Sequence, residues 1–159
     1  MEKFGCWVPT QLELNNAAKK STRKILTSEF VIYKIFFEIP KIPPSLNKTF
    51  RTHYHVRNKI FKEWYQLIQD QVKGKEPPSP LPRCRIEVER CFYRMLDYDG
   101  LVASLKPAID GLIHSSIILD DTYKITGPWI VTQSFRKKKE GPLLKVKIYE
   151  LPVDKKSDG

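Results

Sequence analysis

The sequence predicts an α+β domain, in which strand-like segments come before and after a run of helical segments. Residues 30–40 are dense in β-branched and aromatic side chains, and two further strand-like runs close the chain. Between them, apolar residues recur at the three- and four-residue spacing of amphipathic helices. With 159 residues, the chain is long enough for one domain with a substantial core.

The composition divides the chain into three parts. Residues 1–28 are polar and basic and predict an N-terminal arm, either solvated or in contact with DNA. Residues 29–152 form the predicted folded domain, and residues 153–159 form a polar C-terminal tail. Breaker-rich stretches at 41–58 and 75–82 predict loops within the domain.

Each predicted element has its own signal in the sequence. The run 30–40 ends at a proline, and 83–96 alternates apolar and charged residues, so both predict strands, the second with one wet face. Residues 60–74 predict an amphipathic helix that ends at a glycine, and residues 101–116 predict a second helix, interrupted by Pro107. Residues 129–139 and 143–151 predict two strands joined as a hairpin around Gly141. Trp64 and Trp129 are expected in the core.

The charge of the chain indicates a polyanionic partner. Lys and Arg number 28 against 18 Asp and Glu, a formal net charge of +10, which favours nucleic acid, although an ordinary basic protein remains an alternative. Charged residues interrupt every apolar run, and the N-terminus lacks a signal-peptide pattern, so we expect no membrane association and a cytoplasmic location. Three cysteines without a CxxC pair indicate a reducing compartment, and the scattered histidines predict no zinc site.

Two acidic pairs stand out against this basic background. Asp97 and Asp99 follow a strand-like run, and side chains at i and i+2 of a strand leave the same face. Asp120 and Asp121 follow another short apolar run. Carboxylates from both segments are the hard oxygen ligands that Mg²⁺ prefers, whereas each pair alone also suits a solvated turn.

Lys106 lies between the two acidic pairs in the sequence. In one helix running on from Asp99, residues 99, 106 and 110 would share a face, which would bring Lys106 close to the carboxylates. A surface ion pair with Asp110 at i, i+4 is the ordinary alternative, and it is compatible with a catalytic role.

The order of PPSLN, DYDG, a lysine, DGL and LDD resembles the RusA-type Holliday junction resolvases, from about residue 30 to residue 150. The resemblance implies a small mixed β-sheet packed against helices, a homodimer, and bacterial or phage origin. It implies a Mg²⁺-dependent endodeoxyribonuclease, with Mn²⁺ as a possible substitute, that cuts four-way junctions in recombination and repair and leaves 5′-phosphate and 3′-hydroxyl ends. Matching the motifs assigns the essential acids to Asp97, Asp99 and Asp121, with Asp120 as the substitute if the register slips, and the essential lysine to Lys106.

This chain departs from the family pattern at two places. Gly100 stands where the family often has Asn, and Lys106 follows the second acid by seven residues instead of four. A branched-DNA-binding protein of the same fold without cleavage activity is therefore the alternative function, and a basic scaffold protein is a third.

Basic and aromatic residues supply candidate DNA contacts in two segments, each of which could also be a solvated loop. The first segment contributes Lys48, Arg51, His53, Tyr54, His55, Arg57 and Lys59, and the second Arg136, Lys137, Lys138 and Lys139. The edge of the sheet at residues 129–135 is the candidate dimer contact.

Overall fold

The computed structural model describes residues 33–153. Contacts divide the chain into two units, Met1–Phe30 and Val31–Gly159, and the described residues all lie in the second. The predicted arm and nearly all of the predicted tail lie outside the described residues. No helix within 33–153 is long and apolar enough to cross a membrane.

The fold is a mixed four-stranded sheet with helices, as the α+β prediction required. The strands are β1 (Lys34–Ile39), β2 (Cys84–Phe92), β3 (Ile130–Phe135) and β4 (Leu143–Glu150), in the order β1-β4-β2-β3. β4 pairs antiparallel with both neighbours, and β2 pairs parallel with β3. The helices are α2 (Leu46–Phe50), α3 (Tyr54–Val72), α4 (Tyr98–Ser104), α5 (Lys106–His114) and α6 (Tyr123–Thr126), and a 3₁₀ turn, η1, spans Lys138–Glu140.

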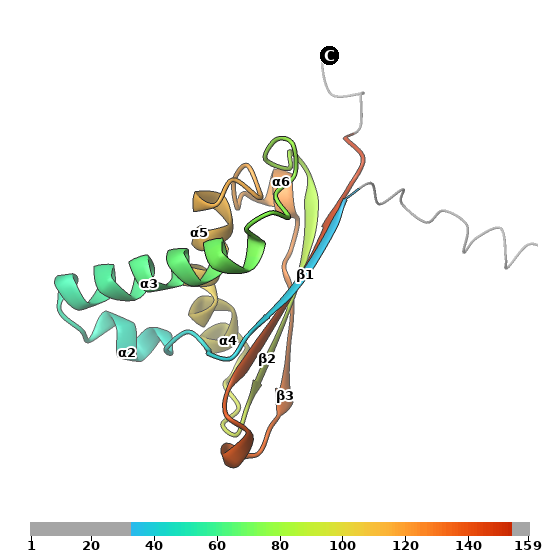
Figure 1. Cartoon of the computed structure of the whole chain (residues 1–159). Helices are drawn as coiled ribbons and strands as arrows, with labels where there is room; N and C mark the ends of the chain where they lie inside the picture. Colours follow the sequence, from blue (N-terminus) through green and yellow to red (C-terminus); the bar gives the residue numbers. More distant parts are fainter. Residues whose placement is uncertain (1–32, 154–159) are drawn as a thin grey trace, which may run out of the picture. The chain divides into compact units, whose positions relative to one another are not determined.

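Among the described residues, helices α2 to α5 lie on one face of the sheet (Figure 1). Alternation along the strands explains this arrangement, because every second residue of β1, β2 and β4 is buried. The buried face meets Trp64 and Ile68 of α3, both fully buried, and Leu112 of α5. Burial of each such side chain stabilises the fold by roughly 1.5–3 kcal/mol. Trp64 is therefore a core residue, and Trp129 packs against the core while partly buried, as predicted.

The predicted hairpin between the last two strands is wrong. β3 and β4 are not neighbours, because β4 inserts between β1 and β2 and leaves β3 at the edge of the sheet. The central place suits β4, since its residues alternate into the core at Leu144, Val146 and Ile148. In β3, by contrast, no residue is fully buried.

The single helix predicted for 101–116 is two helices. α4 ends at Ser104 and α5 begins at Lys106, with Leu105 between them. Pro107 explains the break, because it occupies the first turn of α5, where a missing N–H is not needed. Residues 99, 106 and 110 therefore do not share the face of one helix.

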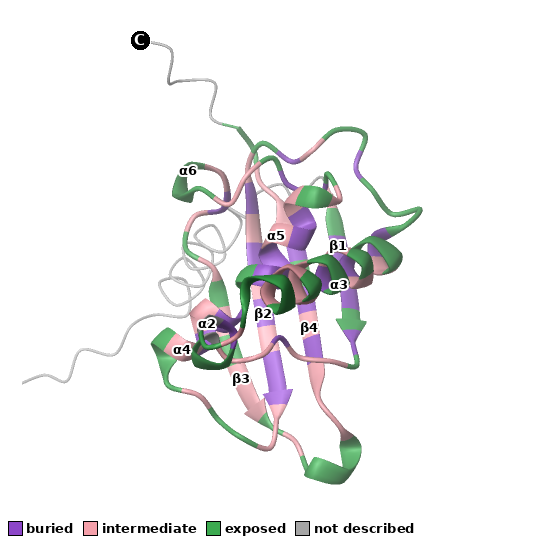
Figure 2. Ribbon diagram, turned by 90° about the vertical axis from the view of Figure 1, so that its left-hand side faces the viewer, coloured by how far each residue is buried: buried purple, intermediate pink, exposed green. Residues whose placement is uncertain are grey.

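The predicted loop 41–58 contains helical structure as well. α2 lies within it, and α3 begins at Tyr54, six residues before the predicted start. The N-cap residue of α3 is His53, which makes no side-chain capping bond. The residues that usually mark the start of a helix, Ser, Thr, Asp or Asn, are therefore missing from the N-cap position. Figure 2 shows α2 beside α4, so this basic segment lies next to the helix that carries Asp99.

Candidate active site

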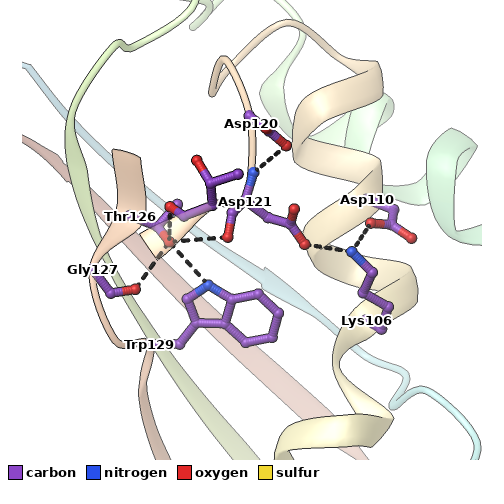
Figure 3. Close-up of polar contacts among 8 residues, drawn as sticks. Lys106, Asp110, Asp120, Asp121, Thr126, Gly127 and Trp129 are labelled. Carbon is purple, nitrogen blue, oxygen red and sulfur yellow. Dashed lines mark hydrogen bonds and ion pairs between the residues drawn. The ribbon is translucent and has the colours of Figure 1, made fainter. Parts of the chain in front are cut away.

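Lys106 is bonded to two carboxylates (Figure 3). Its ammonium group lies 2.8 Å from Oδ1 of Asp110, one turn along α5, and donates a hydrogen bond to Oδ2 of Asp121. The i, i+4 pair with Asp110 is the one that the sequence predicted. The contact with Asp121, 15 residues further along the chain, joins two residues that the family pattern assigned to the site.

The turn that carries Asp121 is fixed at both ends. The backbone N–H of Asp121 donates to Oδ1 of Asp120 (2.8 Å), so Asp120 holds the turn and does not face Lys106. At the other end, the indole of Trp129 donates to the hydroxyl of Thr126 (3.3 Å), and that buried hydroxyl lies 3.0 Å from the carbonyl of Gly127. These bonds anchor the short helix α6 against the core, directly after the acidic pair.

The charges in this cluster stabilise one another. Burial lowers the pKa of Lys106, but hydrogen bonds to Asp110 and Asp121 outweigh burial, so the pKa lies above its ordinary value. The hydrogen bond from Lys106 lowers the pKa of Asp121, against an opposing effect of burial. At neutral pH, Lys106 is therefore a cation and Asp121 an anion. A fixed cation of this kind can stabilise negative charge that develops on a phosphate.

The first acidic pair lies at the N-terminus of α4. Asp97 is the N-cap, and its Oδ1 accepts a hydrogen bond from the backbone N–H of Gly100 (3.1 Å). Asp99 is exposed in the first turn. Strand β2 already ends at Phe92, so the expectation that both acids leave one face of a strand end is wrong. A Cβ at position 100 would lie 2.4 Å from Oδ1 of Asp97, so this placement of the carboxylate requires the glycine.

Two polar residues of the sheet hold the segment that leads into Asp97, and sequence reasoning missed both. Gln133 of β3 accepts from the backbone N–H of Leu96 (3.0 Å) and donates to its carbonyl (2.7 Å). Arg90 of β2 is 4% exposed and donates to the carbonyl of Arg94 (2.8 Å). The signal for Arg90 was present, because it continues the alternation of buried residues along β2 that faces the helices.

The first acidic pair lies at the N-terminus of α4, whereas Asp121 contacts Lys106, which begins the next helix. The seven residues of α4 advance by roughly 10 Å, from Asp97 at one end to the α5 junction at the other. Among residues 33–153, no group of three or more His, Cys, Asp or Glu side chains could hold a metal ion. The three predicted ligands are therefore not gathered into one cluster.

The acid pair by itself has the right donor chemistry for Mg²⁺. Mg²⁺ is commonly held by one or two carboxylates together with waters and substrate phosphates. Asp97 and Asp99 match that number, and Asp99 makes no side-chain hydrogen bond or ion pair within the described region. Ligation by Asp97, Asp99 and Asp121 stays a prediction.

One predicted DNA-contact segment lies beside α4, and the other lies beside the start of the β2–α4 connection, residues 93–97. In the first segment, Lys48, Arg51, His53 and Lys59 are exposed and Arg57 is half-buried, on or beside α2 and α3. In the second segment, the backbone N–H of Arg136 donates to the carbonyl of Phe92, and the ammonium of Lys138 lies 5.8 Å from the ring of Tyr93. Lys137 and Lys138 are exposed, and Arg136 is half-buried.

Comparisons with known proteins do not identify the chain. No protein-family model matches it, and no curated protein matches its sequence.

Proposed function

We propose that this protein is a Mg²⁺-dependent endodeoxyribonuclease that cuts branched DNA, in particular four-way junctions, by paired phosphodiester hydrolysis. The observation that carries the proposal is the contact between Lys106 and Asp121, because the family pattern assigned both residues to one site although they are 15 residues apart. The resemblance to the RusA-type resolvases supplies the reaction, the homodimer and the role in recombination and repair. Cleavage of both strands of a junction favours two sites related by a two-fold axis.

In this proposal, some residues bind DNA and others take part in the reaction. The exposed cations of the two predicted DNA-contact segments bind phosphates and orient the strand across the β2–α4 connection. Asp97 and Asp99 would hold Mg²⁺, which would supply an acidified water and neutralise charge on the phosphate. Lys106 donates to an oxygen of the scissile phosphate as charge develops there, and Asp110 and Asp121 keep it protonated and in place.

The test is a junction-cleavage assay with a matched variant. Purified protein with Mg²⁺ or Mn²⁺ should place paired nicks in a synthetic four-way junction, and EDTA should stop the reaction. Asp99→Asn should abolish cleavage while DNA binding is retained, because the change weakens metal capture and also reduces repulsion of phosphate. Asp70→Asn, an exposed acid of α3, is the control and should cut normally.

A second candidate is a branched-DNA-binding protein without cleavage activity. It is favoured by one observation, that residues 33–153 contain no group of three or more His, Cys, Asp or Glu side chains that could hold a metal ion. Junction binding without cleavage across several divalent ions would support this candidate and exclude the nuclease.

A further inference from the structure

The carboxyl ends of the parallel strands β2 and β3 carry aromatic side chains next to one another. Phe92 and Phe135 are partners in the register of the two strands, so their side chains leave the same face of the sheet. Figure 2 shows the two arrows ending side by side. The ring of Tyr93 follows directly, with its centroid 4.3 Å from that of Phe92.

Phe135 is unusual for an aromatic residue in a strand. It is 69% exposed, and its ring makes no aromatic or cation–π contact within the described part of the chain. The sheet beneath it is nevertheless fixed, because Gln133 of the same strand bonds the backbone of Leu96. A large apolar ring is therefore held in solvent on a rigid support, where it is free to contact a ligand.

Two cations lie over the ring of Tyr93. Arg94 lies 5.4 Å and Lys138 5.8 Å from the centroid of the Tyr93 ring. Glu140 is the sole acid among residues 92–96 and 135–140, and it accepts from the backbone N–H of Lys137 (3.0 Å). The cations of these two segments are Arg94, Arg136, Lys137, Lys138 and Lys139.

We propose that Phe92, Tyr93 and Phe135, with these five cations, form a surface that binds unpaired nucleotides of a DNA strand, with a base stacked on Phe135. The combination of one exposed ring, two half-buried rings and neighbouring cations matches single-stranded nucleic acid, because aromatic rings stack on bases of any sequence and cations bind the phosphates. A protein partner is less suitable, because the cores of protein–protein interfaces are depleted in charged residues and this surface has five cations and one acid.

The surface is also continuous with the proposed active site. Tyr93 and Arg94 belong to the connection that Gln133 and Arg90 hold and that ends at Asp97. A strand stacked there would therefore run toward the acid pair. The role of this surface in cleavage rests on the proposed function. If the protein is the proposed nuclease, it would select DNA with unpaired nucleotides at the branch over continuous duplex.

The experiment measures binding in EDTA, so that it does not depend on cleavage. Fluorescence anisotropy compares a labelled duplex that contains a single-stranded gap with the same duplex intact. Phe135→Ala should weaken binding to gapped DNA by about fivefold or more, and change binding to intact duplex by less than about twofold. Phe36→Ala is the matched control, since Phe36 is an exposed aromatic residue (46%) of the opposite edge strand, and it should bind both DNAs normally.

Phe135→Leu separates stacking from a general apolar contact, because leucine keeps an apolar side chain but has no ring. It should bind gapped DNA as weakly as Phe135→Ala; wild-type binding by the leucine variant would overturn the proposal. The proposal would also fail if Phe135→Ala converted a dimer into a monomer in sedimentation, since the surface would then belong to a second copy. If the wild type cleaves junctions but Phe135→Ala binds gapped DNA normally, the proposed surface is refuted and the nuclease stands. If binding to gapped DNA depends on the ring but the wild type cleaves no junction, the nuclease is refuted and the surface stands.

Discussion

The side-chain amide of Gln133 bonds both backbone groups of Leu96, the residue directly before Asp97. The two hydrogen bonds measure 3.0 and 2.7 Å. They replace backbone pairing between strands beyond Phe92, where β2 ends. They join the edge strand β3 to the start of the site, so the position of Asp97 depends on a residue 36 positions away in the sequence.

Gln133→Glu should reduce cleavage without reducing DNA binding. A glutamate still accepts from the N–H of Leu96 but cannot donate to its carbonyl, so one bond is replaced by repulsion between two oxygens. We expect kcat to fall by roughly tenfold, with KM nearly unchanged, since a displacement of catalytic groups affects turnover more than affinity. Steady-state junction cleavage checks this.

Thr132→Val is the control for Gln133, because Thr132 belongs to the same strand but faces the side of the sheet away from the core, with Glu89 and Lys145. It should cut at the normal rate. Equal turnover by Gln133→Glu and the wild type would show that the bridge to Leu96 does not position Asp97.

The elements were more predictable from the sequence than their arrangement. Alternation in 83–96 and the helical spacing in 60–74 are local signals, and the corresponding strand and helix are present. The insertion of β4 between β1 and β2 depends on contacts between distant segments, which no local pattern encodes.

The same limit applies to the candidate site. The i, i+4 pair of Lys106 with Asp110 follows from spacing alone. The contact of Lys106 with Asp121 could be expected only through a family resemblance, because a turn of the chain brings the two residues together. Gln133 was not predicted as a site residue, because the sequence of an edge strand does not indicate which distant backbone a polar side chain will bond.

Lys106→Ala should lower turnover at saturating DNA by about a hundredfold or more, which is typical when a donor to a developing anion is removed. The protein should remain folded, because Lys106 is 46% exposed on its side chain and such surface ion pairs contribute at most about 1 kcal/mol. Single-turnover cleavage and thermal unfolding measure the two effects.

Asp110→Asn gives the comparison for Lys106. It removes one of the two charged partners but leaves the lysine and its contact with Asp121, so turnover should fall by less than about tenfold. Wild-type turnover by Lys106→Ala would remove the lysine from the site.

The carboxylate of Glu89 should make the fold sensitive to acid. The hydroxyl of Ser134 donates to it (2.8 Å) and Lys145 lies 3.1 Å away on β4, and these bonds hold its pKa below the ordinary value of 4.5. A lowered pKa in the folded state stabilises the fold above the unfolded-state pKa, and this stability is lost as the pH falls through the folded-state pKa. Glu89→Gln should therefore narrow the difference in Tm between pH 7 and about pH 3.

Ser134→Ala removes the hydrogen bond that is the largest cause of the lowered pKa of Glu89. It should therefore narrow the difference in Tm between pH 7 and about pH 3, but by less than Glu89→Gln does. Because the Glu89 side chain is 34% exposed, the contribution at neutral pH should stay below about 1 kcal/mol. An unchanged difference in Tm for Glu89→Gln would show that other groups control the acid response.

Gly111→Ala tests the contact between α3 and α5. An added Cβ would lie 2.8 Å from Cγ1 of Ile68 and 3.4 Å from the carbonyl of Trp64, and both residues are fully buried. Overpacking costs about 1–3 kcal/mol, which exceeds the gain of about 1 kcal/mol in helix propensity, so the free energy of unfolding in urea should fall. In an Ile68→Ala background the contact with Cγ1 is gone and the contact with Cβ of residue 68, at 3.1 Å, remains, so there Gly111→Ala should cost less. Equal effects in both backgrounds would mean that Ile68 does not limit the approach of the helices.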